Sequence, residues 1–192
     1  MKIKQSIPEV SKSLHRVIGI DPGSLRCGYG VIERGSDNSY IYITSGTIKI
    51  SGKKTLDRRL KEIYDSLLEV IRAYRPDVAA IEKVFFAKNV RSALSLGHVR
   101  GVSLLAAVKE GLQVYEYSPL EVKKAIVGYG RAEKSQIQAM VKNILKINLS
   151  LLPPRESSIF GDPISYDSAD ALALSICHLN TMRFGELIRE EV

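Results

Sequence analysis

Four acidic residues occupy positions where carboxylates could bind divalent cations. Asp21 directly follows the short apolar run 17–20, and Glu82 directly follows the apolar run 78–81. Asp167 and Asp170 are three residues apart, so on a helix they would share one face, one turn apart. Phosphodiester cleavage by paired Mg²⁺ ions about 3.5–4 Å apart needs hard oxygen ligands of this kind. The pattern indicates metal-dependent phosphodiester chemistry, provided that the fold brings the carboxylates together.

Each carboxylate also has an ordinary structural explanation. An Asp before Pro-Gly, such as Asp21, is commonly a turn residue. Asp167 could serve as a first-turn partner of a helix dipole, and Glu82 could lie at a solvated strand end. The chemical interpretation therefore depends on convergence of all four.

The first half of the chain predicts three consecutive antiparallel strands. Residues 16–20 are mostly β-branched and end at a Pro-Gly turn, which is typical of a buried strand. Two further strands are expected at 29–33 and 40–50, because the turn-forming cluster 35–38 separates them.

Alternating helices and strands follow. Apolar residues recur with helical periodicity between the N-cap candidate Thr55 and Pro76, which predicts an amphipathic helix. The wholly apolar run 78–81 predicts a strand covered on both faces. A small-residue helix is expected at about 89–110 and a fifth strand at 113–117.

The remaining sequence predicts three helices. A capping-box pattern starts the first at Ser118, the second spans about 133–146, and the last runs from Asp167 to roughly Phe184. A long loop at 148–166 precedes the last helix. The order fits an α/β, RNase H-like fold: a five-stranded mixed sheet, with its first three strands antiparallel, flanked by helices. It fits an actin-like fold less well.

The sheet gives a reason to expect convergence. Ends of neighbouring strands lie only about 5 Å apart, or twice that with one strand between them. Asp21 and Glu82 each end a predicted strand, so both could face one pocket.

Composition limits the class of protein. The 192 residues suit one domain, which we place at 16–185, with a flexible extension at 1–15 and a tail at 186–192. A net charge of +7 and a pI near 9.4 favour a polyanionic partner without requiring one. Cys27 and Cys177 are too few for a disulfide framework, which predicts a reducing, cytoplasmic location. The first fourteen residues contain no apolar run, so neither a signal peptide nor a membrane anchor is expected.

Three acidic motifs resemble those of the RuvC family of bacterial Holliday-junction resolvases. They lie at 18–24 with 28–32, at 80–85 and at 167–173. Shorter matches occur in the same order at 87–89, 101–102, 116–117, 122–123 and 132–136. Segment 148–166 is longer than the family pattern, and the N-terminal extension is additional.

The resemblance implies a function and its cofactor. It implies that Asp21, Glu82, Asp167 and Asp170 hold Mg²⁺, two ions per subunit, with Mn²⁺ as a substitute. The substrate would be a four-way DNA junction, cut by in-line attack of water to leave 5′-phosphate and 3′-hydroxyl ends. It also implies a homodimer and partnership with the RuvA–RuvB branch-migration complex.

Basic residues leave the same strand ends as the carboxylates and could form a rim that binds phosphates. They are Lys88, Arg91, Lys123, Lys124, Arg131 and Lys134. By resemblance, Lys123 and Lys134 match functional lysines, and Lys134 would help with charge in the transition state. Ordinary solvated surface lysines are the alternative.

Two aromatic residues lie just beyond Glu82. Phe85 matches the family, which implies that it stacks on an unpaired base near the crossover. Without the resemblance Phe85 would be assigned to the core, and the role of Phe86 stays open.

Symmetric cutting of two strands requires two active sites, which a C2 dimer would supply. The helix at 89–110 has a small-sided apolar set that could pack between subunits or in the core of one chain. The set is Ala93, Gly97, Gly101, Leu104 and Leu105.

Three other functions compete with junction cleavage. The nearest is an RNase H-like nuclease that cuts RNA. An actin-like phosphotransferase would need a second nucleotide-binding half, for which 192 residues leave no room. A junction-binding module without catalysis would leave four carboxylates unexplained beside DNA.

Overall fold

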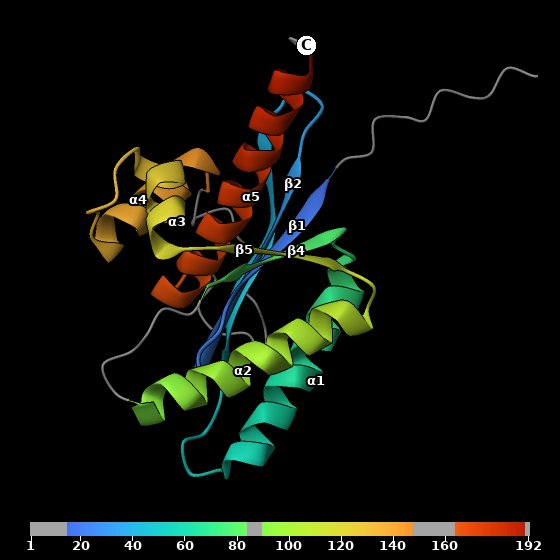
Figure 1. The fold of residues 1–192 in the computed structure, drawn as a ribbon, viewed down its shortest axis with the longest axis vertical. Helices are drawn as coiled ribbons and strands as arrows, with labels where there is room; N and C mark the ends of the chain where they lie inside the picture. Colours follow the sequence, from blue (N-terminus) through green and yellow to red (C-terminus); the bar gives the residue numbers. More distant parts are fainter. Residues whose placement is uncertain (1–14, 84–89, 148–163, 191–192) are drawn as a thin grey trace, which may run out of the picture.

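A five-stranded mixed sheet forms the centre of the molecule. The structure is a computed structural model that describes residues 15–83, 90–147 and 164–190 (Figure 1). The strands are β1 (Arg16–Asp21), β2 (Arg26–Arg34), β3 (Tyr40–Lys49), β4 (Val78–Glu82) and β5 (Gln113–Tyr117). Their order is β3-β2-β1-β4-β5, with β1, β2 and β3 antiparallel and β4 parallel to both neighbours. The predicted sheet is therefore confirmed.

Helices cover both faces of the sheet (Figure 1). One face packs against α1 (Leu56–Tyr74) and α2 (Val90–Lys109), and the other against α3 (Pro119–Val127), α4 (Lys134–Ile144) and α5 (Tyr166–Glu190). Alternate strand residues face opposite layers. Ile18 and Ile20 join the α1–α2 core, whereas Val17 joins the core under α5.

Local sequence explains where the helices begin and end. The apolar stripe of α1 buries Ile63, Leu67 and Ile71, and the helix stops at Arg75, which has a left-handed backbone just before Pro76. Helix α3 begins with the predicted capping box, in which the Ser118 hydroxyl accepts from the Glu121 backbone N–H.

Two boundaries differ by three residues or more from those predicted. Strand β2 begins at Arg26 rather than Tyr29, because Gly28 pairs with Asp21 at the end of β1. Helix α5 continues to Glu190 rather than ending near Phe184. The predicted extension at 1–15 and loop at 148–166 lie largely outside the described residues. Among the helices that the described ranges contain, none is both long and apolar enough to cross a bilayer.

Candidate active site

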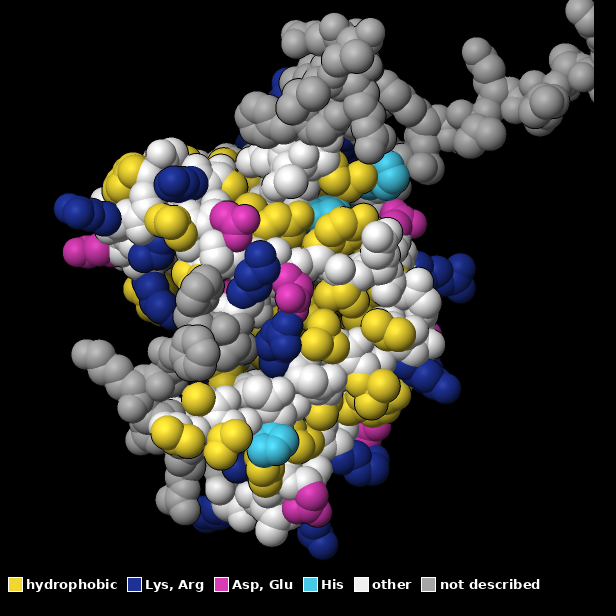
Figure 2. All heavy atoms as spheres, in the orientation of Figure 1, with side chains coloured by type: hydrophobic (Ala, Val, Ile, Leu, Met, Phe, Trp, Pro, Cys, Tyr) yellow, Lys and Arg dark blue, Asp and Glu magenta, His cyan; other side chains and the backbone are white. Residues whose placement is uncertain are grey.

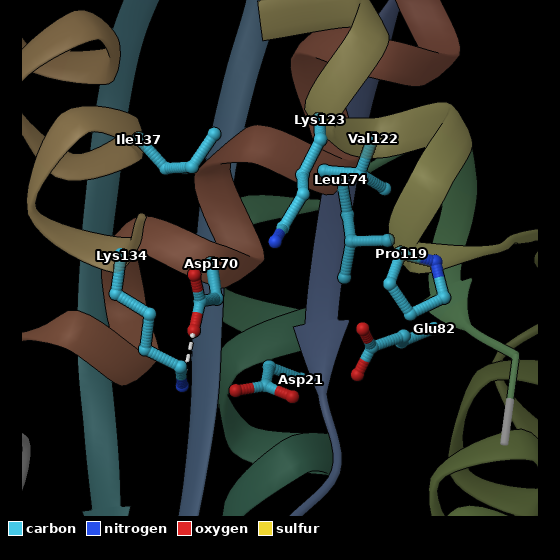
Figure 3. A pocket seen from close by; sticks show the side chains of 9 residues that line it. All are labelled: Asp21, Glu82, Pro119, Val122, Lys123, Lys134, Ile137, Asp170 and Leu174. Carbon is cyan, nitrogen blue, oxygen red and sulfur yellow. Dashed lines mark hydrogen bonds and ion pairs between the residues drawn. The ribbon is translucent and has the colours of Figure 1, made fainter. Parts of the chain in front are cut away.

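Three of the four predicted carboxylates line one pocket of about 300 Å³ (Figure 3). They are Asp21, Glu82 and Asp170, and they come from three segments far apart in the sequence. The other residues around the pocket are Pro119, Val122, Lys123, Lys134, Ile137 and Leu174. The pocket thus combines three acids and two lysines with an apolar wall. Sequence reasoning did not identify that wall.

The sheet places the first two acids. Asp21 ends β1 and Glu82 ends β4, and these strands are parallel neighbours in which Ile20 is paired with Ile81. Their carboxyl ends therefore meet at one edge, where ligands bind in open α/β sheets. Both acids also lie on the face that α5 covers. Gly19 in β1 and Ala80 in β4 pack beneath that layer, and residues two positions further along a strand face the same side.

Glycines in the sheet place Asp170. A Cβ atom at Gly19 would collide with the carbonyl oxygen of Ala171, and one at Gly28 would collide with that of Asp167. The backbone of α5 can therefore press directly on β1 and β2, which sets the start of the helix at the edge where Asp21 ends.

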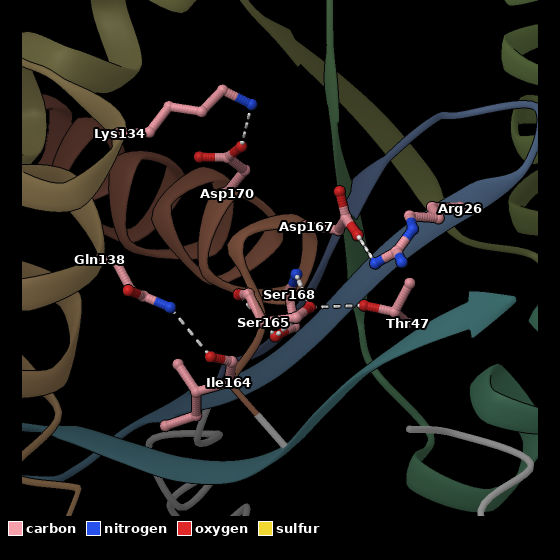
Figure 4. Close-up of polar contacts among 9 residues, drawn as sticks. All are labelled: Arg26, Thr47, Lys134, Gln138, Ile164, Ser165, Asp167, Ser168 and Asp170. Atoms are coloured by element: carbon pink, nitrogen blue, oxygen red, sulfur yellow. Dashed lines mark hydrogen bonds and ion pairs between the residues drawn. The ribbon is translucent and has the colours of Figure 1, made fainter. Parts of the chain in front are cut away.

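Hydrogen bonds fix the first turn of α5 (Figure 4). The Ser165 hydroxyl accepts from the Ser168 backbone N–H at 3.2 Å and lies 2.6 Å from the Thr47 hydroxyl on β3. The Gln138 side chain on α4 donates to the Ile164 carbonyl at 3.0 Å. These contacts connect the helix start to β3 and α4 before Asp170 is reached.

Crowding of the acids changes their titration. Burial, together with the negative charges of Glu82 and Asp170, raises the pKa of Asp21 to about 7, although the positive charge of Lys134 acts in the opposite direction. Burial likewise raises the pKa of Glu82 and of Asp170. Three carboxylates that repel one another in a half-buried pocket favour a bound cation, and their oxygens are the ligands that hard divalent cations prefer.

Of the two lysines that line the pocket, Lys134 is the one that pairs with a pocket acid. It begins α4 directly after the N-cap Glu133, whose backbone N–H is bonded by the Gln136 side chain. Its ammonium group donates to the Asp170 carboxylate at 3.2 Å, and the Asp170 charge raises the pKa of Lys134.

Asp167 is not in the pocket lining. Its carboxylate points toward Arg26 at the start of β2, with 3.7 Å between Nη1 and Oδ2 (Figure 4). Within the described ranges, no three His, Cys, Asp or Glu side chains are placed to hold one metal ion together as they stand. The fold thus brings three predicted ligands to one pocket and leaves the fourth beside it. Sequence reasoning missed Arg26, because the predicted strand began at Tyr29 and left Arg26 outside it.

The predicted DNA contacts fall into three groups. Lys123 and Lys134 line the pocket. Lys124 and Arg131 are exposed on α3 and just before α4, outside the pocket lining. Phe85, Phe86 and Lys88, together with the side chain of Arg91, lie outside the described residues. On the face seen in Figure 2, Lys and Arg side chains lie beside acidic ones near the centre.

Comparison with known proteins decides the family. A family model described as "Crossover junction endodeoxyribonuclease RuvC" matches residues 17–178. The chain belongs to the RuvC family. RuvC of Cupriavidus necator is 49% identical over 165 residues, which cover 86% of this chain and 83% of that one. RuvC of Caldanaerobacter subterraneus is 45% identical over 166 residues, covering 86% and 93%.

Solved RuvC structures share the architecture. Thermus thermophilus RuvC aligns with a TM-score of 0.71 at 32% identity, covering 88% of this chain and 96% of that one. The same protein in complex with a Holliday junction substrate aligns with a TM-score of 0.74, covering 89% and 96%. The yeast mitochondrial Holliday junction resolvase Ydc2, at 14% identity and a TM-score of 0.59, shares the fold. The predicted RNase H-like fold and the RuvC resemblance are confirmed.

Proposed function

We propose that this RuvC-family chain is an endonuclease that resolves Holliday junctions by paired, symmetric cleavage in recombination and DNA repair. The observation that carries the proposal is the pocket in which Asp21, Glu82 and Asp170 meet at the carboxyl edge of the sheet. Support for the substrate comes from the Thermus relative, which is described in complex with a Holliday junction. The same complex favours a DNA junction over RNA as the substrate.

The cofactor in this proposal is Mg²⁺, with Mn²⁺ as a substitute. Asp21, Glu82 and Asp170 would hold it from the pocket, and Asp167 would join them after leaving Arg26. When bound, paired Mg²⁺ ions activate a water molecule for in-line attack and stabilise the leaving oxygen. The products in this proposal are 5′-phosphate and 3′-hydroxyl ends.

The side chains of the chain itself orient the DNA. Lys123 lines the pocket on the side opposite Asp21 in Figure 3, where its ammonium can contact the phosphate next to the cleaved bond. Lys134 can stabilise negative charge that develops at the phosphate once Asp170 binds metal instead. Exposed Lys124 and Arg131 extend the positive rim toward flanking phosphates. Phe85, Lys88 and Arg91 belong to the same proposal through the family resemblance.

The proposed assembly is a homodimer formed through α2. Exposed residues Val90, Leu94, Gly97, Gly101, Leu105 and Val108 recur at intervals of three or four residues and form one stripe along α2. Figure 2 shows hydrophobic side chains at the surface over the region that α2 occupies in Figure 1. Of the predicted set, Gly97, Gly101 and Leu105 are exposed, Ala93 is half-buried and Leu104 packs into the core. A contiguous apolar surface on a helix favours a protein interface, and a C2 pair would supply two cleavage sites.

Partnership with RuvA–RuvB is part of this proposal through the family alone.

Cleavage of an immobile synthetic four-way junction tests the proposal. The full chain is incubated with junction, linear duplex or RNA–DNA hybrid of matched sequence, in Mg²⁺ or in EDTA. We expect paired nicks near the branch point of the junction in Mg²⁺, little cutting of the other substrates and none in EDTA. Cutting of the hybrid in preference to the junction would instead identify an RNA-directed nuclease.

A further inference from the structure

The two aspartates at the start of α5 are held by different cations. Asp170 faces the pocket and is bonded to Lys134, whereas Asp167 turns to Arg26 (Figure 4). Asp167 is near enough to the pocket for its charge to contribute to the raised pKa of Asp21. The Asp167 carboxylate therefore lies beside the other acids while it is paired with the Arg26 guanidinium.

The position of Arg26 follows from the strand. Residues 26 and 28 of β2 face the same side of the sheet because side chains alternate. At Gly28 that side is filled by the Asp167 backbone, so the Arg26 side chain emerges next to the first turn of α5. Its partner across the sheet is Lys49 on β3, which is exposed.

The pair is unequally exposed. The Arg26 side chain is 62% exposed, whereas that of Asp167 is 24% exposed. The Arg26 guanidinium can thus be reached by an anion from solvent at the rim of the pocket. Ion pairs this exposed are weak, and a phosphate matches the planar donors of arginine in a bidentate manner. A phosphate of bound DNA can therefore replace Asp167 as the partner of Arg26.

We propose that Arg26 is a positioning residue that holds Asp167 outside the carboxylate pocket until a DNA phosphate takes its guanidinium, so that DNA binding completes the set of metal ligands. This inference rests on the proposed metal-dependent function. It implies that the protein binds divalent cations more weakly without DNA than with it. Because such coupling is reciprocal, metal strengthens DNA binding by the same factor.

Removal of the Arg26 charge tests the inference without measuring cleavage. The dissociation constant for Mn²⁺ is measured by electron paramagnetic resonance of the free ion, on the full chain without DNA. Arg26→Gln and the length-preserving Arg26→Met free Asp167, so we expect Mn²⁺ to bind about 5-fold more tightly than to the wild type. Arg26→Lys retains the pair and should stay within about 2-fold of the wild type.

Lys49→Gln is the matched control. It removes one positive charge directly across the sheet from Arg26, and the structure gives Lys49 no ion pair with any described residue. Its Mn²⁺ affinity should match the wild type, which separates release of Asp167 from a general change in charge. Thermal melting of each variant verifies that it is folded.

A second arm adds duplex DNA of about 20 base pairs, which supplies phosphates but no branch point. Mn²⁺ affinity should rise in the wild type and in Lys49→Gln, and should rise little further in Arg26→Gln, where Asp167 is already free. Unchanged or weaker Mn²⁺ binding by both neutral variants would overturn the inference while leaving the proposed function intact. Absence of Mn²⁺ binding by the wild type, with DNA present, would overturn the proposed function as well.

Discussion

Lys134 and Asp170 form an ion pair at one side of the pocket, with 3.2 Å between Nζ and Oδ2 (Figure 3). The lysine is on the first turn of α4 and the aspartate on the second turn of α5. The charges of Lys134 and Asp170 thus offset each other in the absence of metal. Binding of metal to Asp170 would release the Lys134 ammonium toward the substrate.

Replacement of Lys134 by Gln should therefore impair catalysis more than binding. We expect the rate of junction cleavage in saturating Mg²⁺ to fall about 10- to 100-fold, because a donor aimed at developing charge is lost. Gel-shift affinity for the junction should fall only a few-fold. Lys142→Gln, on the same helix and outside the pocket lining, is the control. Equal losses of binding and cleavage would assign Lys134 to DNA binding alone.

Asp21→Asn should abolish cleavage and preserve binding. The variant keeps the size of the side chain but removes one carboxylate, a proposed metal ligand, from the pocket lining, so we expect a loss of at least about 100-fold in rate. Junction binding should be unchanged or stronger, because an acid facing DNA phosphates is neutralised. Asp37→Asn, in the exposed turn between β2 and β3, controls for loss of a carboxylate elsewhere. Cutting by Asp21→Asn in Mg²⁺ would refute the assignment.

The pH dependence of stability should also identify Asp21. Its pKa is about 7 in the folded protein against 3.8 in a free side chain. Between these values the folded state holds a proton that the unfolded chain has released, so stability decreases as the pH rises. The decrease is complete above pH 7. In EDTA, Asp21→Asn should therefore be more stable than the wild type above pH 7, by about 4 kcal/mol, and the difference should vanish near pH 4.

Urea unfolding in EDTA at several pH values measures this effect. Hydrogen bonds from Ser39 lower the pKa of Asp37, which is opposite to the shift at Asp21. Asp37→Asn should therefore show no gain in stability at high pH. Added Mg²⁺ should stabilise the wild type more than Asp21→Asn. A constant difference between the two proteins across the pH range would contradict the raised pKa.

Gly28→Ala should disrupt the site from beneath. Its Cβ atom would collide with the backbone of Asp167, so α5 must shift and carry Asp167 and Asp170 with it. We expect a loss of about 1–3 kcal/mol in the free energy of unfolding, together with loss of cleavage. Gly52→Ala, where a Cβ atom would lie 3.6 Å from the nearest side-chain atom of Leu25, should be nearly neutral. Urea unfolding compares the two, and equal stabilities would mean that α5 does not need this close contact.

Leu105→Glu should separate the proposed dimer. Leu105 is exposed within the apolar stripe of α2, and a buried charge at a subunit interface is unfavourable without a partner. Light scattering after size-exclusion chromatography should give the mass of one chain for the variant and of two for the wild type. Ile41→Glu, an exposed apolar residue of the edge strand β3, should remain dimeric. A monomeric wild type would remove the basis for the dimer.

The sequence by itself determined the order of the helices and strands and the identity of the three pocket acids. Runs of β-branched residues, an amphipathic α1 and the capping box at Ser118 are local patterns, and local patterns determine local structure. Asp21 and Glu82 could be expected to be close together because both end parallel strands of one sheet.

Only the tertiary structure decided where the acids of α5 point. Three-residue spacing put Asp167 and Asp170 on one helix face, yet one carboxylate bonds Lys134 and the other pairs with Arg26. These partners are distant in sequence, and which of them an acid meets depends on how closely α5 packs against Gly19 and Gly28. That packing arises from contacts among β1, β2 and α5 together, so no single segment of the sequence encodes it.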